Sequence, residues 1–210
     1  PMTMFFIIGD VDDAAVEGHI QDHPEEAGQL FHAIVEEARA KGTFPVPRDK
    51  IGIYRTPRPG VWRVNTTRLL GLDGTNAEDL TRAEVEGRKQ VFALVEFMQS
   101  NLPGFAHARL LETAAQIGVR ETRRIVGDFV LTVADLVEGA DFPDTIGFSG
   151  YGWDLPDPKR PSVQPMHGVQ RRRDVTPIPY RVMVPRPVEN VICPGRAISV
   201  ERDVLGPLRE

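Results

Sequence analysis

Apolar residues dominate the first eight positions of the chain, and this run ends at Gly9. A short apolar run closed by glycine is typical of a buried β-strand. It is too short to span a bilayer, and it lacks the basic start and the cleavage site of a signal peptide. Because the chain begins inside a predicted core strand, we expect it to be part of a longer protein.

Two short helices are predicted next. Asp12 and Asp13 should cap a helix that runs to about Asp22. A second helix is expected to open at residues 24–26, where proline precedes two glutamates, and to end at Gly42. Its apolar positions recur at helical spacing. These positions are Leu30, Phe31, Ile34, Val35 and Ala38.

The longest helix is expected from about Ala77 to Ser100, with Thr75 or Asn76 as its cap. Pro103 and Gly104 should end it. Its buried stripe is predicted from apolar residues spaced three or four apart. The predicted stripe consists of Leu80, Val85, Val91 or Phe92, Val95 and Met98.

Several β-strands are also predicted. Alternating Ile51 and Ile53, the turn at residues 57–60 and the return at residues 61–64 indicate an antiparallel hairpin. Prolines and charges replace any periodic pattern at residues 155–178, which we interpret as a long loop. Residues 180–184 and 188–193 are β-like. The mixture of hairpins and helices predicts an α+β fold.

Composition and charge narrow the function classes. The 210 residues are 41% hydrophobic and 26% charged, which is typical of one large or two small globular domains. A net charge of −5 disfavours nucleic acid as a partner. The basic run at residues 171–173 is interpreted as a solvated loop. The single cysteine, Cys193, excludes an internal disulfide framework and fits a cytoplasmic protein.

Several familiar motifs are absent from the sequence. His19 and His23 would share a helix face, but no third ligand is evident, so we expect no metal site. The P-loop and the Gly-x-Gly-x-x-Gly turn of dinucleotide-binding proteins are missing. So is the Gly-x-Ser-x-Gly elbow of acyl hydrolases.

A cluster of arginines follows an apolar segment. Arg120, Arg123 and Arg124 lie within five residues, together with Glu121. Guanidinium groups bind carboxylates and phosphates in a bidentate manner and stay charged at any working pH. The cluster therefore suits an anionic substrate or a reduced, anionic flavin, and the alternative is a network of structural ion pairs.

A second segment of interest runs from Asn190 to Arg196, where a short apolar stretch leads to Gly195. A glycine at a strand end lets the backbone approach a ligand closely. On its own this signal is weak, because many strands end in glycine.

These two segments carry a resemblance to a known family. Residues 120–132 resemble the stretch RE(S/T)RRI.GEY.LT of a bacterial family of FAD-dependent oxidoreductases. Residues 179–185 and 190–199 resemble its stretch PYR.LVP…NLLVAGR.IS. Three further segments agree with the same family, in the same order. They are the start of the chain, residues 73–88 and residues 103–105.

The resemblance implies a substrate domain of mixed or antiparallel sheet with helices, inserted into a Rossmann-like FAD domain. Residues 1–178 would form the substrate domain, and residues 179–210 a partial return into the FAD domain. The glycine-rich pyrophosphate turn is missing from the sequence. We therefore expect FAD to be the cofactor of the full-length protein, but not to be retained by this chain alone.

The resemblance also implies roles for particular residues. Arg120 and Arg124 would act as electrostatic clamps, Tyr180 as a hydrogen-bond donor or proton carrier, and Arg181 as an anchor. The residues expected to contact FAD are Gly195, Arg196 and Ser199. The chain departs from the family where two histidines are expected, at Arg202 and at Pro156. These changes put proton transfer by histidine in doubt.

The sequence thus predicts part of an FAD-dependent oxidoreductase that transfers hydride from a small substrate, anionic or carbohydrate-like, to flavin. The expected partner is this small molecule, and neither nucleic acid nor a membrane. The alternative is a non-catalytic binding or interaction module that keeps the substrate-domain scaffold without a cofactor. A hydrolase that uses paired carboxylates rests only on the abundance of Asp and Glu.

Overall fold

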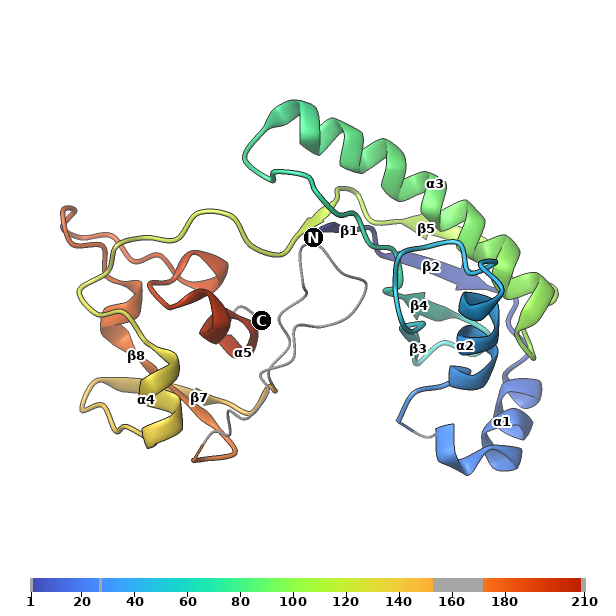
Figure 1. Cartoon of the computed structure of the whole chain (residues 1–210), viewed down its shortest axis with the longest axis horizontal. Helices are drawn as coiled ribbons and strands as arrows, with labels where there is room; N and C mark the ends of the chain where they lie inside the picture. Colours follow the sequence, from blue (N-terminus) through green and yellow to red (C-terminus); the bar gives the residue numbers. More distant parts are fainter. Residues whose placement is uncertain (1, 27, 153–171, 209–210) are drawn as a thin grey trace. The chain divides into compact units, whose positions relative to one another are not determined.

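The computed structural model describes residues 2–26, 28–152 and 172–208. Contacts within the chain divide these residues into two compact units, shown in Figure 1. Unit 1 comprises residues 2–120, and unit 2 comprises residues 121–152 and 172–208. Helices and antiparallel sheets both occur, which confirms the α+β class. The boundary predicted between residues 178 and 179 separates a substrate domain from part of an FAD domain. The two units are defined by packing and not by function, so this boundary stays a prediction.

Unit 1 is built on a four-stranded antiparallel sheet in the order β3-β4-β2-β5. The predicted hairpin is confirmed, because β3 and β4 pair across the turn at residues 57–60. A separate short pair joins β1 to β6. The strands are β1 (Met2–Thr3), β2 (Phe6–Gly9), β3 (Ile53–Arg55), β4 (Trp62–Val64), β5 (Arg109–Thr113) and β6 (Gly118–Val119).

Residues 4–8, which lead into β2, alternate between two environments. Met4, Phe6 and Ile8 are at most 1% exposed and belong to the core of unit 1. Phe5 and Ile7 are only half-buried. Successive side chains of a strand point to opposite faces of a sheet. Phe5 and Ile7 therefore mark a second face of the sheet, which we call the open face.

Two of the predicted helices of unit 1 begin where the sequence indicates. The carboxylate of Asp12 accepts the N–H groups of residues 14 and 15 at the start of α1 (Asp13–Asp22). The side chain of Asn76 caps α3 (Ala77–Asn101) in the same way. Both caps satisfy N–H groups that have no partner within the helix.

The predicted stripe of α3 is partly wrong. Met98 and Val91 are buried, the latter rather than its alternative Phe92, but Val85 is 54% exposed. The buried face runs instead through Ala83 and Gly87, and at Gly87 the chain near Met4 lies very close to the helix. A Cβ atom at Gly87 would lie 3.1 Å from the Cβ atom of Met4. The buried residues of α3 are Ala83, Gly87, Val91, Leu94, Phe97 and Met98.

The second helix starts later than predicted. Residues 24–26 form a short 3₁₀ turn, η1 (Pro24–Glu26), and α2 (His32–Ala40) begins after Phe31, whose φ is 61°. The buried carboxylate of Glu26 explains this start. It accepts the N–H groups of Phe31 and Ala33, each at 2.9 Å, so it caps α2 from outside the helix.

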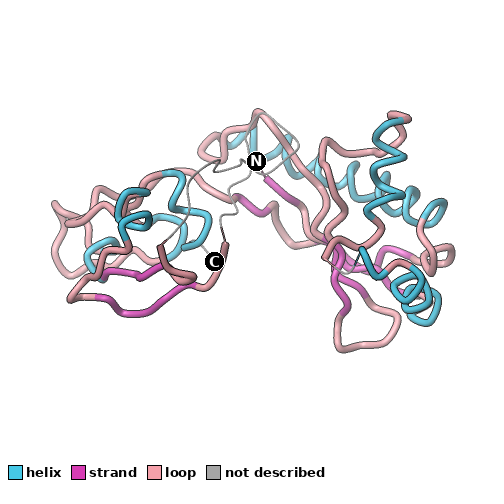
Figure 2. The backbone as a smooth tube through the Cα atoms, turned by 60° about the horizontal axis from the view of Figure 1, so that its bottom comes forward, coloured by secondary structure: helices cyan, strands magenta, loops and turns pink. Residues whose placement is uncertain are grey.

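Unit 2 has less regular structure and its own core (Figure 2). Strands β7 (Thr145–Ser149) and β8 (Thr176–Pro179) form an antiparallel pair. Helix α4 (Val133–Glu138) has a capping box made by Thr132 and Asp135. Its remaining elements are η2 (Tyr180–Met183), η3 (Gly195–Ala197), η4 (Arg202–Val204) and α5 (Leu205–Leu208).

The strands predicted at residues 180–184 and 188–193 are wrong. The first segment is the 3₁₀ turn η2, because the N–H groups of Tyr180 and Arg181 both bond to Asp144 and turn the chain. In the second, Asn190 has a φ of 61°, and no strand of the described part pairs with it. The loop predicted at residues 155–178 lies mostly outside the described residues, and its last three residues belong to β8.

No described helix is both long and apolar enough to cross a membrane.

The cap on α2 leads to a test of stability. Burial raises the pKa of Glu26, but hydrogen bonds from Ala33, His19 and Phe31 outweigh it and hold the pKa below the ordinary value of 4.5. Its stabilisation is therefore present above pH 4.5 and is lost as the pH falls through the lowered pKa. Glu26→Gln should lower the free energy of unfolding by about 1–3 kcal/mol at neutral pH.

Urea unfolding at neutral pH and well below pH 4.5 measures this effect, and the gap between variant and wild type should narrow in acid. Glu25→Gln is the matched control, because Glu25 is exposed and bonds only to His23. Equal losses of stability in the two variants would contradict the assigned cap.

Candidate functional site

Polar and aromatic side chains form a row across the open face of the unit 1 sheet. Ile7 of β2 lies opposite Arg63 of β4 and opposite Glu112 of β5. Tyr54 of β3 lies opposite Arg63. Directly paired residues point to the same face. Tyr54, Arg63, Ile7 and Glu112 therefore form one cross-strand row on the open face.

A groove of about 320 Å³ lies along this row, and we call it the sheet groove. Its floor belongs to β2, and its two sides come from β4 and β5. Its size is at the lower end of small-molecule sites. The residues that line the groove are Phe5, Phe6, Ile7, Arg63, Glu112, Thr113 and Ala114.

Arg120, the first arginine of the sequence cluster, lies on the same face. Its Nε donates to Thr3 Oγ1 at 3.2 Å, and an Nη donates to Asn65 Oδ1 at 3.4 Å. Its guanidinium carbon is 6.0 Å from the ring centre of Phe5, and that of Arg63 is 5.6 Å from the same ring. Two guanidinium groups therefore contact one phenyl ring beside the groove.

A larger cavity of about 570 Å³ lies between α3 and the segment at residues 68–72. Its exposed cations are already paired, Arg82 with Asp79 and Lys89 with Glu86. None of the predicted site residues lines it. The sheet groove is therefore the better candidate within unit 1.

In unit 2 the two segments that carry the family resemblance lie against each other. The N–H of Ile125 donates to the carbonyl of Ala197 at 2.9 Å, and that of Leu131 donates to the carbonyl of Ser199 at 3.2 Å. Gly127 is needed at this contact, because a Cβ atom there would lie 2.7 Å from the Cβ atom of Ser199. The resemblance thus corresponds to a packed structural motif of unit 2.

Arg124 is placed in an ion-pair network. Its Nη lies 3.7 Å from a carboxylate oxygen of Glu121, and an Nη of Arg202 lies 3.0 Å from the other oxygen. The side chain of Glu121 is 17% exposed between them. Arg124 and Arg120 therefore have different surroundings, each within its own unit.

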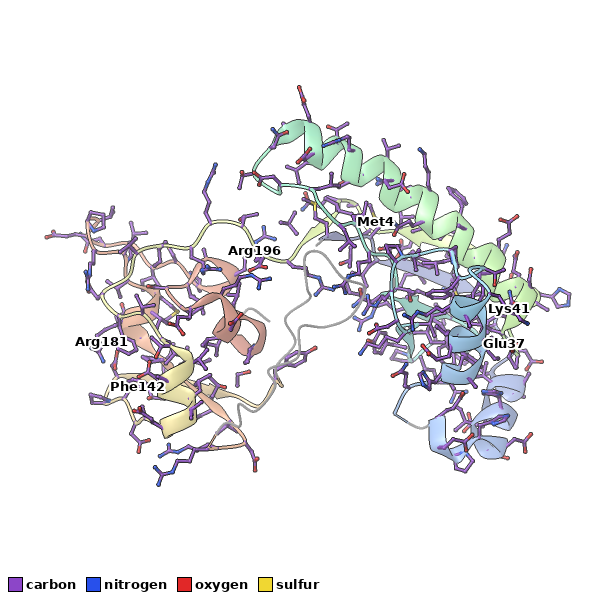
Figure 3. All side chains as sticks on the ribbon, in the orientation of Figure 1. Met4, Glu37, Lys41, Phe142, Arg181 and Arg196 are labelled. Carbon is purple, nitrogen blue, oxygen red and sulfur yellow. The ribbon has the colours of Figure 1, made fainter. Side chains whose placement is uncertain are left out.

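Arg181 is bound to Asp144 through two nitrogens, at 2.9 and 3.1 Å. Its guanidinium also lies 5.0 Å from the ring centre of Phe129, which stacks on Phe142. Figure 3 shows Arg181 and Phe142 close together in unit 2. The hydrogen bonds of Arg181 hold the pKa of Asp144 below its ordinary value of 3.8. Tyr180 precedes this pair, is 40% exposed and donates its N–H to the carbonyl of Asp144.

The residues expected to contact FAD lie in one segment of unit 2. Gly195 has a φ of 75°, and no atom lies within 4 Å of the position of a Cβ, so its backbone is open to a flat ligand. Arg196 is exposed beside it and is labelled in Figure 3. Ser199 is 2% exposed and bonds through its N–H to the carbonyl of Val182. Whether Gly195 and Arg196 contact a flavin cofactor stays a prediction.

The Rossmann-type unit that holds a cofactor pyrophosphate does not occur among the described residues. All sheets in the described part are antiparallel, and no parallel strand–turn–helix unit occurs among them. Nor do the described residues hold a group of three or more His, Cys, Asp or Glu that could bind a metal.

Sequence reasoning did not identify Phe5, Arg63 or Glu112. A signal for two of them was present in the alternation of polar and apolar residues. Arg63 lies between buried Trp62 and Val64, so it must point away from the core. The same alternation places Phe5 opposite to Met4 and Phe6. Glu112 could not be placed, because β5 has an irregular register next to Ile7.

Comparison with models of protein families matches residues 1–210 to the family described as FAD dependent oxidoreductase. Searches among curated proteins and among solved structures find no match to the chain.

The Arg181–Asp144 pair supports a test within unit 2. Its stabilisation is present above pH 3.8 and is lost as the pH falls through the lowered pKa of Asp144. Arg181→Gln should speed hydrogen exchange at the Tyr180 amide several-fold at neutral pH. Arg173→Gln is the control, because Arg173 makes a similar two-nitrogen contact with exposed Asp141. Unchanged exchange at Tyr180 would show that the pair does not hold this turn.

Proposed function

The chain belongs to the FAD dependent oxidoreductase family, and from this premise we propose that it serves the oxidation of a small substrate, anionic or carbohydrate-like, by hydride transfer to flavin. The observation that carries the proposal is the contact of Arg63 and Arg120 with the Phe5 ring beside the sheet groove. Guanidinium groups beside an aromatic floor suit a small molecule with an anionic group.

FAD is the cofactor of this family. When bound, it supplies the acceptor for the hydride. Gly195 would let the flat ring approach the backbone, and Arg196 would place a positive charge beside it. Ser199 would act through the fold of this segment, since its side chain is buried.

Further roles are proposed for the side chains of each unit taken by itself. In unit 1, Arg120 and Arg63 would bind and orient the anionic group of the substrate, while Phe5 excludes water from one side of it. In unit 2, the exposed Tyr180 would donate a hydrogen bond or carry a proton. Arg181 would position Tyr180 through Asp144.

Arg124 would tune the charge of unit 2 through Glu121.

A cytoplasmic location is part of the proposal and rests on the single cysteine.

The second candidate function is a non-catalytic binding module. The observation that favours it is that the lining of the sheet groove comes entirely from unit 1. Such a groove can hold a ligand without any redox chemistry. The absorbance spectrum of the purified full-length protein separates the two functions. A flavin spectrum that is bleached by a bound substrate without oxygen supports the oxidoreductase, and a colourless protein that binds the same molecule supports the module.

The role of Arg120 can be tested by substitution. Arg120→Ala should reduce kcat/KM by roughly 100-fold, or about 3 kcal/mol, if the guanidinium stabilises charge in a site that excludes water. The loss of unfolding free energy should stay within about 1 kcal/mol, as for a partly exposed charged contact. The measurements are flavin reduction by an accepted substrate and the unfolding midpoint of the same preparation.

Arg109→Ala is the matched control, because Arg109 lies on the same sheet but is exposed and bonds to Asp10. Near-normal turnover of Arg120→Ala together with a clearly lowered midpoint would assign Arg120 a purely structural role.

A further inference from the structure

We propose that the sheet groove binds a zwitterion, an α-amino acid with an apolar side chain. This inference rests on the proposed function, because it names the substrate class of the same site. It is drawn from two opposite charges on the two sides of the groove and from the apolar floor between them.

The two charges are Arg63 of β4 and Glu112 of β5, and both line the groove. Within the described part of the chain neither side chain forms an ion pair. Other arginines of the same sheet do, since Arg55 bonds to Glu17 and Arg109 bonds to Asp10. The groove is therefore the place on this sheet where a cation and an anion lie on opposite sides and neither forms an ion pair with a described residue.

The register of the sheet keeps these two charges apart. Each lies opposite Ile7, so their backbones are two strand spacings, or about 10 Å, from each other. The guanidinium of Arg63 also lies 5.2 Å from the ring centre of Tyr54, on β3, which is on the side of β4 away from β5. A ligand with both charges can fill the space between them.

The floor of the groove selects the rest of the ligand. Phe5, Ile7 and Ala114 present apolar surface between the two charges. A volume of about 320 Å³ suits a molecule of the size of one amino acid rather than a peptide or a dinucleotide.

Other small substrates match this groove less well. A dicarboxylate would place its second charge near Glu112, and like charges repel each other. A simple amine would leave Arg63 without an anion, and a sugar would leave both charges without a counter-ion. Only a molecule with a carboxylate and an ammonium group pairs with both sides.

Two-dimensional NMR of the 210-residue chain tests this inference without a cofactor. The probes are racemic phenylalanine, 3-phenylpropionate and phenethylamine, which differ only in their charged groups. Phenylalanine should bind roughly tenfold more tightly than either analogue, with the largest shifts at the amides of Ile7 and Thr113.

Substitutions should remove this preference one charge at a time. In Arg63→Gln, phenylalanine should bind no more tightly than phenethylamine. In Glu112→Gln, it should bind no more tightly than 3-phenylpropionate. Glu96→Gln on α3 is the control, because Glu96 is exposed and lies outside the groove, and it should leave all three affinities unchanged.

Equal affinity for the three probes, or shifts confined to residues outside the groove, would overturn the inference. Flavin reduction in the FAD-loaded protein distinguishes a failure of this inference from a failure of the proposed function. Reduction by a substrate that lacks an amine would overturn the zwitterion and keep the oxidoreductase. Groove binding of phenylalanine by a full-length protein that never carries flavin would keep the zwitterion and overturn the oxidoreductase.

Discussion

The alternation along residues 4–8, which lead into and form most of β2, is the constraint on which the sheet groove depends. Met4, Phe6 and Ile8 are fully buried in the core, so the intervening Phe5 and Ile7 have to face the other way. A slip of one residue would exchange the two sets and bury the groove floor. The close contact between Met4 and Gly87 of α3 helps to keep Met4 on the core face. The same packing that closes the core thus presents Phe5 to Arg63 and Arg120.

In unit 2 the comparable constraint is backbone pairing rather than a sheet. The segment that contains Arg124 and the segment that contains Gly195 are joined by hydrogen bonds between Ile125 and Ala197 and between Leu131 and Ser199. Family resemblance in both segments therefore reflects a shared packing requirement in addition to any contact with a cofactor. Arg124 pairs with Glu121 in this motif, whereas Gly195 keeps its backbone open.

The sequence was sufficient to predict those elements that are stabilised by residues next to them in the chain. The caps Asp12 and Asn76 fixed the starts of α1 and α3, and the proline-rich turn fixed the hairpin. The start of α2 could not be predicted, because its cap is supplied by Glu26 from outside the helix. Residues 188–193 look like a strand only in composition, and strand formation requires a hydrogen-bonding partner. The sequence also identified Arg120, but the groove beside it depends on how three separate strands align.

A crystal structure of the protein soaked with benzoate tests the central claim, that the open face of the unit 1 sheet is the substrate site. Benzoate carries an anionic group and an aromatic ring and cannot be oxidised by hydride transfer from a C–H bond next to an amine or alcohol. The account predicts benzoate in the sheet groove, with its carboxylate at Arg63 or Arg120 and its ring against Phe5. Benzoate bound only in the larger cavity beside α3, or only in unit 2, would contradict it.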